Sequence, residues 1–193
     1  MKRKRVAAVL TLIIILAYTV RVYYVNSTAV APIIQRYPMG ADVAIEDDFF
    51  ESSDEKMNGY TVTVLNTTLL TIDEFQEQYG KVDEYTYDIL DYMLLVCVKF
   101  RNESNTLGES AGINLAQYIL QEGAYITYLE RDVYSYVNDF DSLAFALRFD
   151  TEKEFIIPFG INTEYINIDR IENGTPELVI SLYPHKKSIK LNS

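Results

Sequence analysis

The chain begins with four basic residues followed by a continuous apolar run. Residues 2–5 are Lys-Arg-Lys-Arg, and residues 6–20 carry a polar group only at Thr11, Tyr18 and Thr19. At about 1.5 Å per residue, a helix over residues 6–25 is about 30 Å long, the thickness of a bilayer's hydrocarbon core. We therefore predict a transmembrane signal-anchor helix over residues 6–25, preceded by a basic cytoplasmic tail over residues 1–5.

The charges that flank this helix predict its orientation. Four cations precede it and one, Arg21, lies near its far end, so the positive-inside rule places the N-terminus in the cytoplasm. The rest of the chain is then extracellular, and the protein crosses the cell membrane once. The residues expected to form the anchor are Val6, Leu10, Ile14, Val20, Arg21, Tyr23 and Tyr24.

A cleaved signal peptide is the alternative for the same segment, because a basic start and a short apolar run also define such peptides. Ala29-Val30-Ala31 resembles a cleavage site. Pro32 would directly follow the cut, and Ala31 lies eleven residues beyond Val20. Both features favour an anchor that is retained.

Beyond a linker over residues 26–40, the pattern changes to short strands separated by turns. Residues 60–64 alternate in the manner of a strand, and residues 92–98 form a continuous apolar run typical of a central strand covered on both faces. Residues 143–149 and 178–182 alternate as well, and Pro158 predicts an edge strand or a bulge. We predict seven to nine strands in a β-sandwich domain over residues 41–193.

One short helix is predicted over residues 72–79. Thr71 and Glu74 match a capping box, in which each side chain bonds the other residue's backbone N–H. Leu70 and Phe75 stand at the positions of a hydrophobic staple, and Gly80 is expected to end the helix in the left-handed conformation.

Composition separates the two parts of the chain further. The protein has 193 residues and a formal net charge of −11. Residues 26–193 alone carry 12 cations and 28 anions, a net charge of −16, because the first 25 residues contain five cations and no anion. A body of this charge repels phosphate, so nucleic acid is not an expected partner.

Several segments resemble those of known domains. Residues 92–104 (YMLLVCVKFRNES) look like the central strand of bacterial telokin-like, immunoglobulin-like extracellular domains. Residues 155–158 (FIIP) and 182–191 (LYPHKKSIKL) are similar to later strands of that group. The layout also resembles an uncharacterised family of membrane-anchored proteins from Gram-positive anaerobes. The resemblance implies an immunoglobulin-like sandwich outside the cell and assigns no site.

Candidate chemistry is sparse in this sequence. The only histidine, His185, is expected at the surface of a turn, and the lysines that follow it are expected to protect a terminal strand. The only cysteine, Cys97, is expected to be buried and inert. Weak calcium candidates are the acidic residues Glu46, Asp47, Asp48, Asp139 and Asp141, with solvated acidic loops as the simpler interpretation.

The chain has 16 tyrosines and no tryptophan. Tyrosine is enriched at binding surfaces, so a possible interaction surface consists of Tyr118, Tyr125, Tyr128, Tyr134 and Tyr136. Strands also enrich tyrosine, which favours positions in the core and at its rim.

Together these features predict a non-enzymatic, membrane-anchored binding or accessory module without a cofactor. Its expected partner is an envelope protein, a peptide or a wall component. The alternatives are a calcium-dependent adhesion or wall-binding module, a secreted domain released by signal-peptide cleavage, and a glycoside hydrolase that uses two carboxylates.

Overall fold

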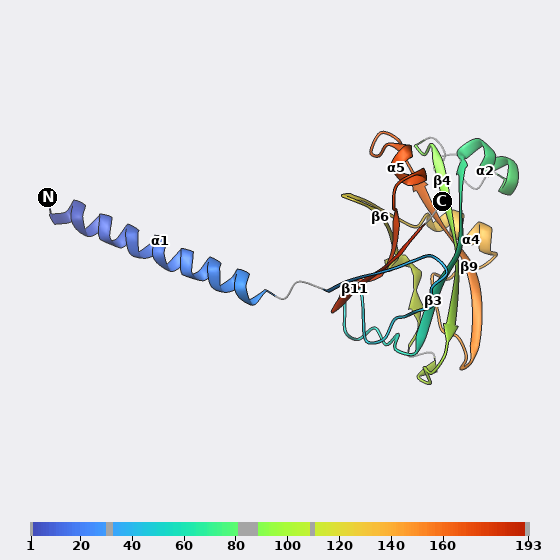
Figure 1. Ribbon diagram of the computed structural model, residues 1–193, viewed down its shortest axis with the longest axis horizontal. Coiled ribbons are helices and arrows are strands. Elements are labelled where there is room, and N and C mark those ends of the chain that lie inside the picture. Colours follow the sequence, from blue (N-terminus) through green and yellow to red (C-terminus); the bar gives the residue numbers. More distant parts are fainter. Residues whose placement is uncertain (1, 30–32, 81–88, 109–110, 192–193) are drawn as a thin grey trace. The chain divides into compact units, whose positions relative to one another are not determined.

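The computed structural model describes residues 2–29, 33–80, 89–108 and 111–191 and divides into two compact units, Met1–Ala31 and Pro32–Ser193. The first unit is a single helix, α1, at Lys2–Thr28 (Figure 1). Its part Val9–Thr28 is long and apolar enough to span a membrane, and none of it is buried. Of the predicted cleavage site, Val30 and Ala31 lie outside the described residues.

The second unit consists mainly of two β-sheets (Figure 1). Sheet A has the order β1-β11-β10-β6-β7, with bounds Ile33–Tyr37, His185–Lys190, Glu177–Ser181, Ile119–Glu122 and Tyr125–Tyr128. Sheet B has the order β2-β3-β4-β9, with bounds Val43–Ala44, Tyr60–Thr71, Tyr92–Asn102 and Thr151–Ile161. A short ladder joins β5 (Ile113–Asn114) to β8 (Ala144–Phe145).

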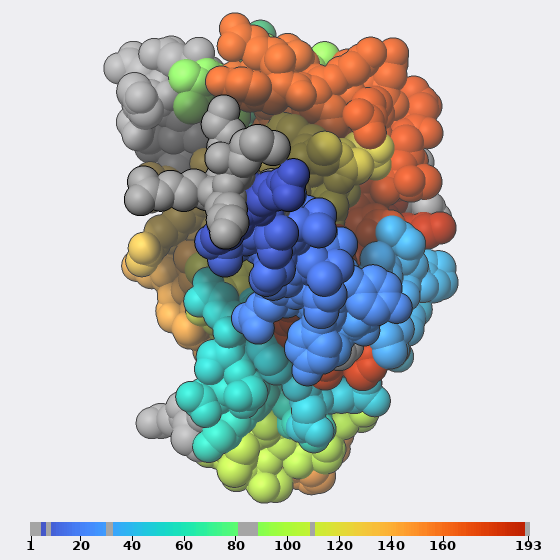
Figure 2. Space-filling view, turned by 90° about the vertical axis from the view of Figure 1, so that its left-hand side faces the viewer, coloured from blue at the N-terminus to red at the C-terminus, as the bar shows by residue number. Residues whose placement is uncertain are grey.

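The first and last strands of this unit lie side by side, because β1 pairs in parallel with β11. Figure 2 shows the light-blue residues of β1 next to red residues from the end of the chain. The remaining strand pairs in sheets A and B are antiparallel. The two ends of the domain sequence therefore close one edge of sheet A together.

The two sheets pack face to face, and the core lies between them. Alternate residues of β4 point inward, which follows from the two-residue period of a strand. The inward residues Leu94, Val96, Val98 and Phe100 share one buried cluster with residues of β9, β10 and β11. Full burial of each such side chain contributes about 1.5–3 kcal/mol to stability.

The outer face of sheet B is covered by two helices, α2 at Ile72–Tyr79 and α4 at Arg131–Asn138. Met93 and Leu95 of β4 pack there against Phe75 and Val133. Strand β4 is thus buried on both faces, which confirms the interpretation of its continuous apolar run.

Helix α2 also confirms its predicted bounds. Both halves of the capping box between Thr71 and Glu74 are formed. Gly80 has φ 87° and ψ 174°, so its φ is positive, but the left-handed helical conformation predicted for it was wrong.

The mainly β sandwich is confirmed, whereas the expectation of a single short helix was wrong. The structure adds α4, a five-residue α5 at Ile168–Glu172 and a 3-10 turn at Leu115–Gln117. The described part of the chain has eleven strands rather than seven to nine, and within residues 143–149 only Ala144–Phe145 forms a strand. Outside that strand, Leu143 and Leu147 still pack against the core, whereas Phe149, predicted to share their face, is 62% exposed.

Strand β9 forms an edge of sheet B, as Pro158 predicted. The Asn138 carboxamide bonds both backbone groups of Ile156, at 2.8 Å each, and so replaces a neighbouring strand. Further along, the Glu130 N–H donates to the Pro158 carbonyl at 2.9 Å, and Leu129 pairs with Phe159. This junction joins the edges of the two sheets just after β7.

Candidate functional site

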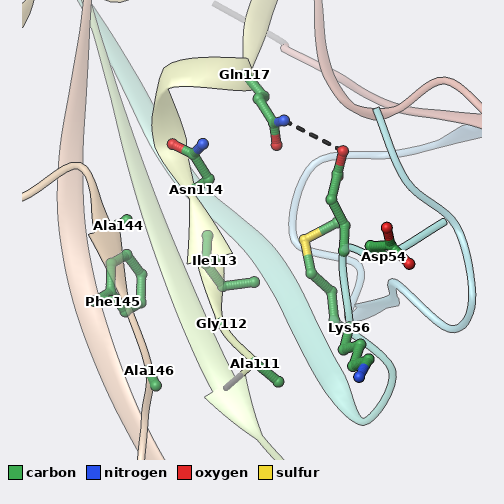
Figure 3. Close-up of a pocket in the computed structure, with 12 residues that line it drawn as sticks. Asp54, Lys56, Ala111, Gly112, Ile113, Asn114, Gln117, Ala144, Phe145 and Ala146 are labelled. Carbon is green, nitrogen blue, oxygen red and sulfur yellow. Dashed lines mark hydrogen bonds between the residues drawn. The ribbon is translucent and has the colours of Figure 1, made fainter. Parts of the chain in front are cut away.

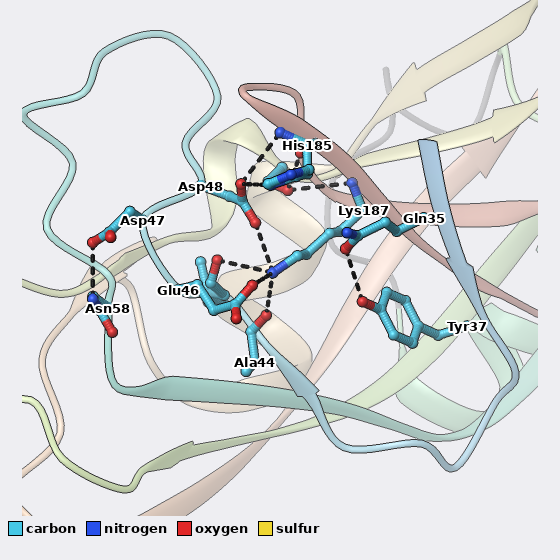
Figure 4. Close-up of polar contacts among 11 residues, drawn as sticks. Gln35, Tyr37, Ala44, Glu46, Asp47, Asp48, Asn58, His185 and Lys187 are labelled. Atoms are coloured by element: carbon cyan, nitrogen blue, oxygen red, sulfur yellow. Dashed lines mark hydrogen bonds and ion pairs between the residues drawn. The ribbon is translucent and has the colours of Figure 1, made fainter. Parts of the chain in front are cut away.

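The most buried charges of the domain form a cluster around Lys187, whose side chain is 1% exposed (Figure 4). Its ammonium lies 2.6 Å from Asp48 Oδ2 and 2.6 Å from Glu46 Oε2, and it donates to the Ala44 carbonyl at 2.7 Å. On the other oxygen of Asp48, His185 Nδ1 lies at 2.8 Å. The three ammonium protons and both oxygens of Asp48 therefore have partners.

Backbone geometry explains why these residues meet. The chain turns after β2, with Glu46 at φ 59° and the Asp48 N–H bonded to the Ile45 carbonyl at 3.3 Å. Phe49 then pairs with Tyr183, just before β11. Because Lys187 and Ile189 lie on the same face of β11 and Ile189 belongs to the core, the lysine points inward to the turn.

This arrangement holds Lys187 in its charged form. Burial alone would lower the pKa of Lys187, but hydrogen bonds to Asp48 and Glu46 outweigh it and raise that pKa. The sequence-based interpretation of Lys187 as strand protection was wrong for this residue, and His185 lies in β11 with its ring 34% exposed rather than in a surface turn. A local pattern could not show that a lysine meets an acidic turn over 130 residues away.

The acidic calcium candidates are divided by the structure. Glu46 and Asp48 hold Lys187, and Asp47 accepts a bond from Asn58 at 2.8 Å. Asp139 and Asp141 are exposed beside the end of α4. Among the described residues, no group of three or more His, Cys, Asp or Glu side chains is placed to hold a metal ion.

A first pocket, of about 420 Å³, lies between the β5–β8 ladder and the loop that contains Asp54 and Lys56 (Figure 3). Ile113 and Phe145 line one side. Glu55 accepts backbone N–H bonds from Phe50, Glu51 and Ser52, which outweigh burial and lower the pKa of Glu55. Of the two carboxylates that line this pocket, Asp54 and Glu55, Glu55 is therefore engaged in holding its own loop.

A second pocket, of about 610 Å³, lies along β7, and we call it the β7 pocket. Four consecutive residues, 124–127, line it from one side, and Gly160 and Asn162 line it from the end of β9. Its other lining residues are Ile89, Leu90, Glu130, Tyr165, Ile166 and Arg170. Three of its apolar side chains face solvent, with Ile89 55%, Ile126 48% and Tyr165 75% exposed.

Among the described residues that line the β7 pocket, Glu130 is the one acidic residue. Burial, and secondarily the charge of Asp132, raise the pKa of Glu130. Among the described residues, no hydrogen-bond donor or cation pairs with its carboxylate. A Cβ built on Gly160 would lie 2.6 Å from Glu130 Oε1, so the glycine leaves room for this carboxylate.

Three other polar side chains of the β7 pocket have partners. Arg170 forms an ion pair with Glu122 at 3.0 Å. The Tyr125 hydroxyl bonds Thr127 and the backbone of Asn162, which tethers β7 to the residue after β9. Asn162 bonds the Ile89 carbonyl at 2.8 Å. Glu130 differs from these three groups, because none of the described residues pairs with its carboxylate.

Comparison with protein families gives a match to the domain of unknown function DUF5028 over residues 34–187. The chain belongs to this family. The match runs from β1 into β11 and includes the Lys187 cluster and the β7 pocket, whereas α1 lies outside it. Comparisons with curated proteins and with solved structures give no match.

The five tyrosines of the predicted interaction surface lie in different environments in the DUF5028 domain. Tyr118 and Tyr134 are fully buried, so they do not belong to the possible interaction surface and lie in the core, the position that strand enrichment favoured; burial raises the pKa of Tyr134 to about 12. Tyr128 and Tyr136 are 62% and 49% exposed. Tyr125 is half-buried and lines the β7 pocket. The apolar partners of the two buried rings, in β4 and β9, are distant in sequence and could not be identified from local spacing.

The predicted anchor residues all lie within α1 of this DUF5028 chain. Six of them have exposed side chains: Val6, Leu10, Ile14, Val20, Tyr23 and Tyr24. Arg21 is exposed as well. The span found in the structure, Val9–Thr28, starts three residues later than the predicted one. In the domain, Cys97 is half-buried, and burial, followed by the charge of Glu154, raises the pKa of its thiol.

The sequence did not identify the residues that characterise the Lys187 cluster and the β7 pocket of this DUF5028 domain. Lys187 was grouped with exposed lysines, while Glu130 and Tyr165 received no role. A signal for Lys187 existed, because it shares the alternating face of Ile189 and Leu191. Glu130 follows an edge strand with no distinctive spacing, and only the fold brings Gly160 beneath it.

Proposed function

We propose that this DUF5028 chain is a membrane-anchored extracytoplasmic module that binds another envelope component and carries out no catalysis. The observation that carries the proposal is the separate α1 helix, whose 20-residue span is apolar and unburied while the domain has its own core. A helix with apolar side chains all round is stable in a membrane, where lipid covers them.

The charges near α1 support the orientation. Residues 2–5 are basic, and the residues beyond α1 carry the acidic excess of the chain. Basic residues are retained on the cytoplasmic side of a membrane, which leaves the DUF5028 domain outside. The absence of a sequence motif that places a nucleophile beside a base supports a binding role rather than catalysis.

Labelling of single cysteines in intact bacterial cells tests this proposal. In a Cys97→Ser background, one variant carries Ser53→Cys in an exposed loop of the domain, and the matched variant carries Lys4→Cys. We expect a membrane-impermeant maleimide to label the Ser53→Cys variant in intact cells. The Lys4→Cys variant should react only after lysis.

The opposite labelling pattern would reverse the orientation and contradict the extracytoplasmic location. N-terminal sequencing of the mature protein separates anchor from signal peptide. A retained α1 is expected, whereas a mature chain that begins at Pro32 would show cleavage and release of the domain.

A further inference from the structure

We propose that the β7 pocket binds an extended peptide segment of a partner protein and takes a lysine or arginine side chain of that segment onto Glu130. This inference rests on the proposed function, because it names the partner class of the binding module. Three features of the pocket carry it: an open strand edge, an unpaired carboxylate and exposed apolar walls.

The open strand edge selects an extended peptide over a compact ligand. Along Tyr125–Tyr128, β7 pairs with β6 and with no second strand of the described chain. Successive side chains of a strand point to opposite faces, so a pocket lined by four consecutive residues, 124–127, runs along the backbone edge. An unpaired edge can accept the backbone hydrogen bonds of an added strand.

Glu130 selects a positive charge. Its carboxylate is partly buried and close to the like charge of Asp132, and no cation of the described residues pairs with it. The basic residue in the described lining of the pocket, Arg170, is already paired with Glu122. A lysine or arginine from a ligand would supply the missing partner, and charge-assisted bonds of this kind are stronger than neutral ones.

The walls of the pocket suit the aliphatic stem of a basic side chain and its apolar neighbours. Ile89, Ile126 and Tyr165 expose apolar surface around the carboxylate. The domain also carries most of the −16 charge of residues 26–193, which attracts a basic segment before contact. Shape and charge therefore favour a basic, β-forming peptide.

Binding of blocked pentapeptides to the full-length chain in detergent micelles tests the inference at neutral pH. The probes have valine and threonine around a central lysine, arginine, norleucine or glutamate. We expect the lysine and arginine probes to bind with a Kd of about 1 mM or tighter. The norleucine and glutamate probes should bind at least about tenfold more weakly, since they cannot pair with Glu130.

Two variants and a matched control locate the site. Glu130→Gln should weaken the lysine probe at least about tenfold, because it removes the charge and retains the shape. Tyr165→Ser, at an exposed position that does not endanger folding, should weaken it about threefold or more by removing an apolar wall. Glu103→Gln, at an exposed carboxylate by the opposite end of β4, should leave affinity unchanged.

Equal affinity for the lysine and norleucine probes would overturn the inference, as would equal losses in Glu130→Gln and Glu103→Gln. Failure of all four probes to bind would overturn it as well. None of these results concerns the orientation of α1, so a failure here is distinguishable from a failure of the proposed function, which the cysteine labelling decides.

Discussion

Asp48 and Glu130 are acidic side chains withdrawn from water in two regions of one domain. Asp48 is 1% exposed and contacts both Lys187 and His185, whereas Glu130 lies in an open pocket and no cation pairs with it in the described chain. An unpaired buried charge destabilises the folded state, and a paired one holds elements together. We therefore interpret the Asp48 region as structural and the Glu130 region as the proposed binding site.

The position of each carboxylate agrees with this difference. Asp48 connects the turn after β2 to β11, so its contacts join segments from opposite ends of the domain sequence. Glu130 lies where the edges of the two sheets join, beside a strand edge that remains open. Substitutions can therefore disturb each region separately.

Removal of the buried cation should have the largest effect. Lys187→Met leaves Asp48 buried without its cation, which should lower the free energy of unfolding by about 3–5 kcal/mol. Denaturant unfolding of the full-length chain in detergent, followed by tyrosine fluorescence, measures this loss. Lys186→Met, which removes the neighbouring lysine, should change stability by only about 0.5 kcal/mol.

A double variant sharpens the same point. Asp48→Leu combined with Lys187→Met should recover a large part of the loss, because apolar replacement of a whole ion pair is often neutral. A Lys187→Met variant as stable as the parent would contradict the structural role of the cluster.

The Lys187 cluster should also make stability depend on alkaline pH. The pKa of Lys187 is raised above its ordinary value of 10.5. The stabilisation is therefore fully present below pH 10.5 and is lost as pH rises through the folded-state pKa. Thermal unfolding above pH 10.5 should show a steeper loss of Tm in the parent than in Lys187→Met, and parallel curves would contradict this linkage.

Peptide binding at the β7 pocket should weaken in acid. The pKa of Glu130 lies above its ordinary value of 4.5, so protonation begins to remove the binding charge above pH 4.5. Lysine-probe titrations from neutral pH downward measure the effect. Affinity should fall through the folded-state pKa of Glu130, and a constant affinity down to pH 4 would show that the carboxylate is not involved.

A third carboxylate, Glu74, provides an exposed and paired reference. Its bond with the Thr71 N–H at 2.8 Å completes the capping box of α2. Thr71→Ala should cost about 1 kcal/mol, which corresponds to about 2–4 °C in Tm for a chain of this size. Glu74→Gln should lose less, because glutamine also completes a capping box.

Calcium should produce the smallest effect. Glu46 and Asp48 are occupied by Lys187, and Asp139 and Asp141 lie exposed without a third acidic ligand among the described residues. Millimolar calcium chloride should leave Tm unchanged. A rise in Tm that Asp139→Asn abolishes would instead reveal a site at the end of α4.

Sequence reasoning predicted local features of this molecule well and distant pairings poorly. The capping box at Thr71, the central strand at residues 92–98 and the edge position of Pro158 depend on neighbours or on intrinsic backbone chemistry, and all were found. The partnership of Asp48 with Lys187 depends on the turn after β2 and on the pairing of Phe49 with Tyr183 just before β11. The environment of Glu130 depends on Gly160 and on the end of β9, which no local pattern connects to it.

Helix α4 shows a further reason why local patterns fell short. Tyr134 and Tyr136 were interpreted through strand alternation, but Val133 and Tyr134 are buried on a helix that covers sheet B. The stability of a short helix depends on such packing more than on helix propensity. Helix α4 could therefore be predicted only once the position of sheet B was known.

Thermal unfolding of Glu130→Gln at neutral pH tests the central claim most directly. The folded state disfavours the charged form of Glu130, as its raised pKa shows, so a neutral isostere should raise Tm. The gap should close near pH 4, where Glu130 itself is neutral. A Tm that falls in Glu130→Gln would contradict the account, because it would show that this carboxylate, like Asp48, stabilises the fold.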